Sequence, residues 1–81
     1  MDNNEKRFTQ IVSKMLVLEE PAINNSISRK NTKSWDSLAH LMLIGRLEDN
    51  FGISLSDDDI VEIKTIADLK LKLKKHGVEI R

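Results

Sequence analysis

Cysteine is absent from this sequence of 81 residues, so disulfide bonds and thiolate metal sites are excluded. Proline and glycine are scarce, with one and three residues, and aromatic residues make up only 4% of the chain. This shortage of turn-forming residues argues against a turn-rich β fold, whereas 40% hydrophobic residues suit a bundle of helices. The length allows one domain over residues 1–81 but no deep, walled active site, so we do not expect an enzyme.

Long hydrophobic runs are also missing from the sequence. No stretch approaches the length needed to span a membrane, and the N-terminus lacks the succession of charged, apolar and small residues typical of a signal peptide. These two absences predict a cytoplasmic protein that does not bind a membrane.

The charges sum to zero but are unevenly distributed. Between Asp36 and Glu62 there are seven acidic residues and one arginine, a local charge of −6. Between Lys64 and Arg81 there are six basic and two acidic residues, a local charge of +4. The acidic segment suits a basic protein partner. The lysines of the basic segment point in several directions around a helix, so we do not expect nucleic-acid binding.

The first part of the chain predicts a helix followed by a long loop. The helix is indicated by apolar residues that share one face and by possible caps at residues 2–4; the apolar residues are Phe8, Ile11, Val12, Met15 and Leu16. We expect Pro21 to end this helix. The polar stretch from Glu20 to Trp35 predicts an ordered loop, pinned to the core by Ile23 and Ile27 and a candidate for a functional role.

A second helix is expected to begin at Asp36 or Ser37 and to end before Gly52, because these are good capping residues. Successive residues lie about 100° apart around a helix, which groups five apolar side chains on a core face. They are Leu41, Leu43, Ile44, Leu47 and Phe51. Leu38 and Met42 fall on a separate arc with Gly45, Arg46 and Asp49, which predicts an exposed apolar patch next to Ser37.

Two further helices follow. Ser56 and Asp59 have the spacing of a capping box, and they open a short third helix that runs through Glu62 and buries Ile60. Thr65 and Asp68 repeat this spacing and open a fourth helix that ends near His76 and Gly77.

The alternation of leucine and lysine over residues 69–74 would by itself indicate a strand. The capped start and the shared face of Ile66, Leu69 and Leu73 favour a helix instead. The predicted fold is therefore all-α, a four-helix bundle with three longer helices, one short third helix and a long loop between the first two.

Other polar residues are better explained by structure than by chemistry. His40 projects near the core face and His76 lies near a helix end, with no further ligand at metal-binding spacing. Consecutive carboxylates diverge around a helix, so Asp57, Asp58 and Asp59 are interpreted as caps and not as metal ligands.

Ser37 is the residue best placed to carry a modification. A phosphate esterified to it would lie at the positive end of a helix, beside unpaired backbone amides. The alternative is that Asp36 and Ser37 only cap the helix, and the tripeptide Asp36-Ser37-Leu38 does not decide between the two.

The surrounding motifs do favour one interpretation. In order and spacing they resemble the acyl carrier protein family over residues 8–75; the motifs are Trp35-Asp36-Ser37-Leu38, Leu47-Glu48, Phe51-Gly52-Ile53, Leu55, Asp59-Ile60 and Thr65-Ile66-Ala67-Asp68-Leu69. The resemblance implies that Ser37, preceded by Asp36, accepts 4'-phosphopantetheine from coenzyme A through a separate phosphopantetheinyl transferase. It also implies a monomeric carrier that catalyses nothing and holds its cargo as a thioester for loading and transfer enzymes. These partners would bind at Leu38, Met42, Gly45, Glu48 and Asp49.

The sequence departs from the acidic carriers of fatty-acid synthesis at Ala39, Met42 and Arg46. Trp35 and the pair His40-Leu41 look more like specialised carriers, including those of D-alanyl and other aminoacyl groups. The cargo, acyl or aminoacyl, stays open. The alternative function is a small helical module that binds a partner through the Leu38 and Met42 face without modification.

Overall fold

The computed structural model describes residues 3–80 of the chain. It contains α1 (Asn3–Leu16), the 3₁₀ helix η1 (Glu20–Ala22), α2 (Ser37–Phe51), α3 (Asp57–Glu62) and α4 (Ile66–Lys75). No strand occurs within residues 3–80, where Ser28 and Thr65 form an isolated β-bridge. The predicted all-α fold, with three longer helices and a short third one, is confirmed. No helix in this described range is both long and apolar enough to cross a membrane.

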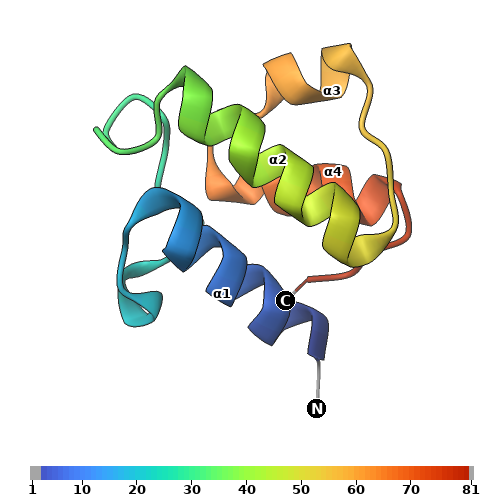
Figure 1. Cartoon of the computed structure of the whole chain (residues 1–81), viewed down its shortest axis with the longest axis horizontal. Coiled ribbons are helices and arrows are strands. Elements are labelled where there is room, and N and C mark those ends of the chain that lie inside the picture. The colour runs from blue at the N-terminus through green and yellow to red at the C-terminus, as the bar shows by residue number, and fades with distance from the viewer. Residues whose placement is uncertain (1–2, 81) are drawn as a thin grey trace.

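The helices enclose one hydrophobic core. α1 and α2 run antiparallel to each other, and α4 passes behind α2 in the view of Figure 1. Each of these three helices contributes buried side chains, and the connecting segments add four more; the core residues are Phe8, Val12, Leu16, Leu43, Ile44, Leu47, Ile66, Leu69 and Leu73 from the helices and Trp35, Leu55, Ile63 and Val78 from the connections. This burial is the main stabilising contribution to the fold.

α1 ends earlier than the sequence predicted, at Leu16. Val17 adopts a left-handed backbone conformation with φ of 55°, and the Leu18 amide donates to the Ser13 carbonyl at 3.0 Å. Pro21 therefore does not end α1, as predicted, but lies inside η1. The reason is local: the chain has already turned at Val17 before the proline is reached. Of the predicted N-terminal caps, residue 2 lies outside the described residues.

The loop between α1 and α2 is held against the start of α4 by main-chain hydrogen bonds. The Arg29 amide donates to the Lys64 carbonyl at 2.9 Å, and the Ile66 amide donates to the Ile27 carbonyl at 2.9 Å. Ile23 and Ile27 pack partly buried against the core. These contacts agree with the predicted ordered loop and fix the segment that leads to Ser37.

α2 begins and ends where the sequence predicted. Asp36 is the N-cap and accepts a hydrogen bond from the Ala39 amide at 2.8 Å, and Gly52 is the left-handed C-cap with φ of 64°. The prediction that Leu41 faces the core is wrong, because its side chain is 60% exposed. The buried face of α2 includes His40. The centre of this face therefore lies a fraction of a turn away from Leu41.

α4 keeps its predicted capping box, whereas α3 keeps only the Ser56 half of the predicted Ser56–Asp59 box, because the Asp59 carboxylate pairs with Lys72 and Lys75 instead. The Ser56 hydroxyl accepts from the Asp59 amide at 3.1 Å, and Thr65 and Asp68 form a complete capping box. α3 buries Asp59, whereas Ile60, which was predicted to be buried, is only half-buried. Adjacent residues lie about 100° apart around a helix, and in α3 Asp59 faces the interior, which leaves Ile60 at the edge of the buried face.

Candidate functional site

Ser37 is the first residue of α2, and its side chain is exposed. Its hydroxyl forms no hydrogen bond with any residue in the described range 3–80. Asp36, which precedes it, uses its carboxylate to cap the Ala39 amide at 2.8 Å. The Asp36 side chain thus stabilises the helix start, and the Ser37 hydroxyl is left free for an external reagent.

A hollow of about 240 Å³ opens beside Ser37, between the start of α2, the end of α3 and the preceding loop. Three of its lining residues are apolar, and the other three carry a guanidinium, a hydroxyl and an imidazole; the lining residues are Arg29, Ser37, His40, Leu41, Ile60 and Val61. The structure therefore brings the loop and α3 to the attachment candidate.

The floor of this hollow is held by His40, which is only 4% exposed. The indole N–H of Trp35 donates to His40 Nδ1 at 3.0 Å, so the imidazole proton is on Nε2, which donates to the Ile60 carbonyl at 2.9 Å. Burial lowers the pKa of His40, and the nearby Arg29 charge lowers it further, against the opposite effect of the Ile60 carbonyl. His40 is thus a neutral structural residue, as predicted, that ties α2 to α3.

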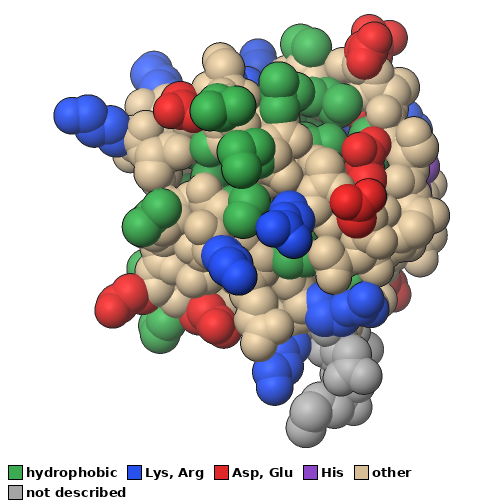
Figure 2. Space-filling view, in the orientation of Figure 1, with side chains coloured by type: hydrophobic (Ala, Val, Ile, Leu, Met, Phe, Trp, Pro, Cys, Tyr) green, Lys and Arg blue, Asp and Glu red, His purple; other side chains and the backbone are tan. Residues whose placement is uncertain are grey.

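An exposed apolar surface lies next to the hollow. Leu38 and Met42, predicted to be exposed, are 69% and 52% exposed, and Leu41 and Val61 join them from α2 and α3. We call these four residues the α2–α3 apolar patch. Figure 2 shows hydrophobic side chains gathered over the first half of α2 and over α3.

Sequence reasoning missed two members of this patch, Leu41 and Val61. Val61 lies about 200° around α3 from the buried Asp59, but the sequence did not show that Asp59 is the residue that faces inward. Leu41 was assigned to the wrong face.

The other predicted partner-binding residues lie further along α2. Gly45 is half-buried and Asp49 is exposed. The Glu48 carboxylate accepts a hydrogen bond from the Leu55 amide at 2.8 Å, so it also supports the connection to α3. The structure therefore places Leu38 and Met42 beside Ser37, and Glu48 and Asp49 in the second half of the helix.

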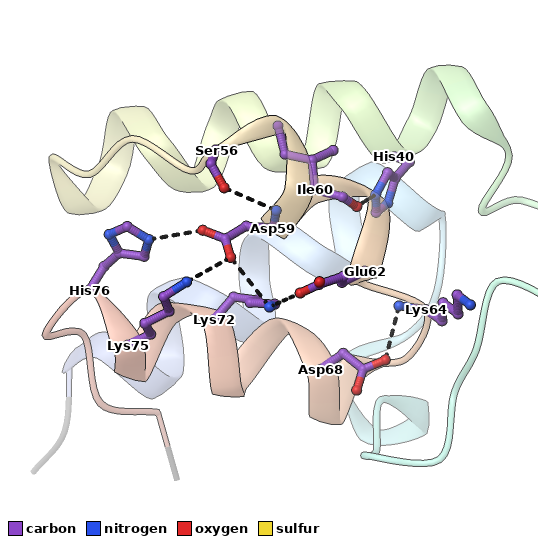
Figure 3. A network of polar contacts seen from close by, with 10 residues as sticks. All are labelled: His40, Ser56, Asp59, Ile60, Glu62, Lys64, Asp68, Lys72, Lys75 and His76. Carbon is purple, nitrogen blue, oxygen red and sulfur yellow. Dashed lines mark hydrogen bonds and ion pairs between the residues drawn. The ribbon is translucent and has the colours of Figure 1, made fainter.

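A second polar cluster joins α3 to α4. Asp59 is 3% exposed and lies 3.0 Å from the Lys75 ammonium and 3.3 Å from both Lys72 and His76 (Figure 3). The hydrogen bond from Lys75 is the main cause that lowers the pKa of Asp59. Burial opposes this shift, and His76, Lys72 and Ser56 lower the pKa further. Lys72 also pairs with Glu62, which raises the Lys72 pKa. Asp59 and His76 therefore have structural roles.

Two comparisons with known proteins bear on this arrangement. A family model described as the phosphopantetheine attachment site matches residues 35–71. Among solved structures, a candidate acyl carrier protein from Mycobacterium tuberculosis, Rv0033, is similar, with a TM-score of 0.79 and 26% sequence identity. The similarity covers 90% of this chain and 97% of the other.

The residues at the start of α2 fit a covalently attached phosphate group. The matched segment contains one serine that is both exposed and at the N-terminus of a helix of 15 residues, where backbone amides favour an anion. The adjoining hollow leaves the hydroxyl accessible. The match to the attachment-site model over residues 35–71, the four-helix fold and the similar carrier structure together support a non-catalytic carrier protein of the acyl carrier type, to which 4'-phosphopantetheine is covalently attached.

Proposed function

We propose that Ser37 is the attachment residue and that this chain, a monomeric single-domain carrier, presents an acyl or aminoacyl thioester to partner enzymes in the cytoplasm. The observation that carries this proposal is the free, exposed hydroxyl on the first residue of α2, inside the matched segment 35–71. When bound, the phosphopantetheine group supplies a terminal thiol for the thioester.

The chain itself offers no base to activate Ser37. His40 is the nearest imidazole along α2, but its Nδ1 accepts from Trp35 and its Nε2 donates to the Ile60 carbonyl. A serine hydroxyl needs an adjacent base to become a good nucleophile. We infer that a separate phosphopantetheinyl transferase supplies that base and coenzyme A supplies the group.

The absence of cysteine also suits a thioester carrier. With no cysteine in the sequence, the thiol of the arm is the only thiol on the molecule. No internal thiolate can then attack the thioester and take the cargo. Acyl and aminoacyl groups are equally compatible with this property.

The test is the intact mass of the protein after co-expression with a phosphopantetheinyl transferase. We expect the native chain to gain one phosphopantetheine unit and Ser37→Ala to gain none. Ser54→Ala is the matched control, because Ser54 is also an exposed serine next to a helix, and this variant should be modified. Modification of Ser37→Ala would overturn the assignment.

Partner enzymes are proposed to bind at the α2–α3 apolar patch and along α2 at Gly45, Glu48 and Asp49. The support is the exposure of the patch next to Ser37 and the local charge of −6 between Asp36 and Glu62. Complementary charge speeds association, and salt screens exposed charges within about 8 Å at physiological ionic strength.

Asp49→Lys is the variant that tests this electrostatic contribution, because Asp49 is exposed, whereas Glu48 also bonds the Leu55 amide. We expect slower loading by the cognate enzyme, an unchanged unfolding midpoint and a loading rate that falls as salt rises. A rate that responds to neither change would remove the electrostatic contribution.

The alternative is a helical interaction module that uses the same patch without modification. The exposure of Leu38, Leu41, Met42 and Val61 is the observation that favours it. A native chain that gains no mass from the transferase, yet binds a partner through this patch, would support the module over the carrier.

A further inference from the structure

Arg29 lies in the loop before α2, at a position that the main chain holds in place. Its amide donates to the Lys64 carbonyl at 2.9 Å, and the preceding residue, Ser28, forms a β-bridge with Thr65. The Ile27 carbonyl accepts from the Ile66 amide at 2.9 Å. These hydrogen bonds fix the loop against the start of α4. The backbone of Arg29 is therefore held in one position, from which its side chain extends.

The Arg29 side chain borders two hollows. It lines the hollow that contains Ser37, and also a neighbouring hollow of about 490 Å³ whose other lining residues are Ser28, Lys30, Trp35 and Lys64. Of the cations in this corner of the molecule, Arg29 is the one that shares a hollow with the Ser37 side chain.

The Arg29 guanidinium has a hydrogen-bond donor without an acceptor. Among the described residues, Nε of Arg29 is the one buried side-chain nitrogen or oxygen with no hydrogen-bond partner. Arg29 also forms no ion pair with a carboxylate in that range. A buried donor that lacks an acceptor is costly, and native structures rarely leave one unpaired. Nε itself is closed to solvent, so an anion outside the polypeptide would meet this guanidinium through its terminal nitrogens, which are not among the buried unpaired atoms.

A phosphate diester on Ser37 has the chemistry that the Arg29 guanidinium binds. Guanidinium groups bind phosphate oxygens through paired N–H donors and keep their charge at every physiological pH. The diester carries a negative charge and would stand next to the exposed Asp36 carboxylate, so a nearby cation is needed to offset the repulsion. His40 is buried and neutral, with both ring nitrogens committed, and does not supply that charge.

We propose that Arg29 is a positioning residue for the arm, and that its guanidinium binds the phosphate oxygens of the phosphopantetheine attached to Ser37. This proposal rests on the proposed function, because it requires the arm to be on Ser37. The contact would fix the first part of the arm against the loop and limit its rotation about the serine side chain.

The experiment compares fully modified and unmodified proteins of matched sequence. The variants are Arg29→Gln, Arg29→Lys and Lys30→Gln; the last removes the same charge from an exposed neighbour that does not line the Ser37 hollow. The measurements are the difference in thermal midpoint between modified and unmodified protein and the ³¹P chemical shift of the diester. Mass spectrometry establishes that the modification is complete and located on Ser37.

We expect modification to raise the thermal midpoint of the native protein and of Lys30→Gln, and this gain to disappear in Arg29→Gln. Arg29→Lys, which keeps a charge but loses the fork of donors, should retain part of the gain. The ³¹P resonance should move in Arg29→Gln and stay unchanged in Lys30→Gln. If Arg29→Gln does not fold, Arg29→Lys provides the same comparison.

Failure of the proposed function and failure of the Arg29 proposal give different results. If no mass is added at Ser37, the proposed function fails. If Ser37 is modified but the gain and the ³¹P shift are the same with and without Arg29, the proposal for Arg29 is overturned. An Arg29→Gln variant that changes only the binding of a partner enzyme would likewise overturn it, because Arg29 would then be a partner contact.

Discussion

α2 and α3 are joined by a hydrogen bond, yet different forces hold each of them in the molecule. α2 turns three fully buried aliphatic side chains, Leu43, Ile44 and Leu47, into the core. α3 has six residues, and the side chain that it buries is Asp59. A helix this short has little stability of its own, so its position depends on its ties to neighbours.

The ties of α3 are polar on both sides. Towards α2, the neutral His40 donates to the Ile60 carbonyl at 2.9 Å. Towards α4, Asp59 pairs with Lys75 and Lys72 at 3.0 and 3.3 Å (Figure 3). Apolar burial depends little on pH or salt, whereas both of these ties depend on protonation states. The comparison teaches that α2 holds Ser37 in place over a range of pH and salt. The attachment of α3, by contrast, depends on these solution conditions.

The largest expected effect is that of Leu47→Ala, which attacks the apolar attachment of α2. Leu47 is fully buried, and removal of a buried leucine side chain typically costs about 2 to 5 kcal/mol of unfolding free energy. Urea unfolding measures this loss. A loss of less than about 1 kcal/mol would show that α2 does not depend on its apolar face.

Asp59→Asn breaks the charged tie between α3 and α4 and should lower the thermal midpoint by less than Leu47→Ala does. Lys72 and Lys75 would then face each other without the carboxylate between them. Asp58→Asn is the control, because this substitution removes the same charge from an exposed residue of α3. Equal midpoints for the two variants would contradict the importance of this tie.

The Asp59 tie should also weaken in acid. The pKa of Asp59 in the folded state is lowered, mainly by Lys75, from the value of 3.8 for an unperturbed carboxyl. Its contribution to stability is therefore complete above pH 3.8 and is lost as the pH falls below that value. Urea midpoints of the native protein and Asp59→Asn should converge on acidification.

The neutral tie through His40 should also weaken on acidification, but at a higher pH than the Asp59 tie does. Burial lowers the pKa of His40 in the folded state below the unfolded value of 6.5, so the unfolded chain binds the proton more readily. Stability should therefore fall as the pH drops below 6.5. Urea unfolding of His40→Gln should lose this dependence, and His76→Gln should keep it. A pH dependence that survives in His40→Gln would contradict this prediction.

The smallest effect on stability is expected for the α2–α3 apolar patch. Leu41→Ala and Met42→Ala remove exposed side chains, and such changes usually alter the free energy of unfolding by about 0.5 kcal/mol or less. Both should nevertheless impair transfer to or from a partner enzyme. If Met42→Ala unfolds the protein as readily as Leu47→Ala, the patch is part of the core and the docking face lies elsewhere.

The helix boundaries show how far sequence reasoning reached. Asp36, Gly52 and the Thr65–Asp68 capping box were identified from residue type and spacing, and the structure confirms them. These features succeed because a cap joins atoms that are at most a few residues apart. The prediction for the end of α1 was wrong although it is also a local feature, because the left-handed turn at Val17 contains no glycine that would indicate it.

The candidate site shows where sequence reasoning stopped. Ser37 was identified from its motif and its place at a helix start, and its role as the attachment residue stays a prediction. The inclusion of Leu41 in the exposed patch could not be predicted, because the rotation of α2 about its axis is set by what packs against it. The histidine at position 40 was expected near the core, but its bonds to Trp35 and Ile60 were not.

By itself, the sequence determined the all-α character, the caps that open α2, α3 and α4, and the position of a serine at the start of a helix. Each of these follows from interactions within one or two turns of chain. Only the tertiary structure decided that Leu41 and Val61 face solvent, that α3 is tied through Asp59, and that Arg29 shares a hollow with Ser37. The physical reason is that these placements depend on contacts between segments far apart in the chain, such as the Arg29 amide on the Lys64 carbonyl, which no local pattern encodes.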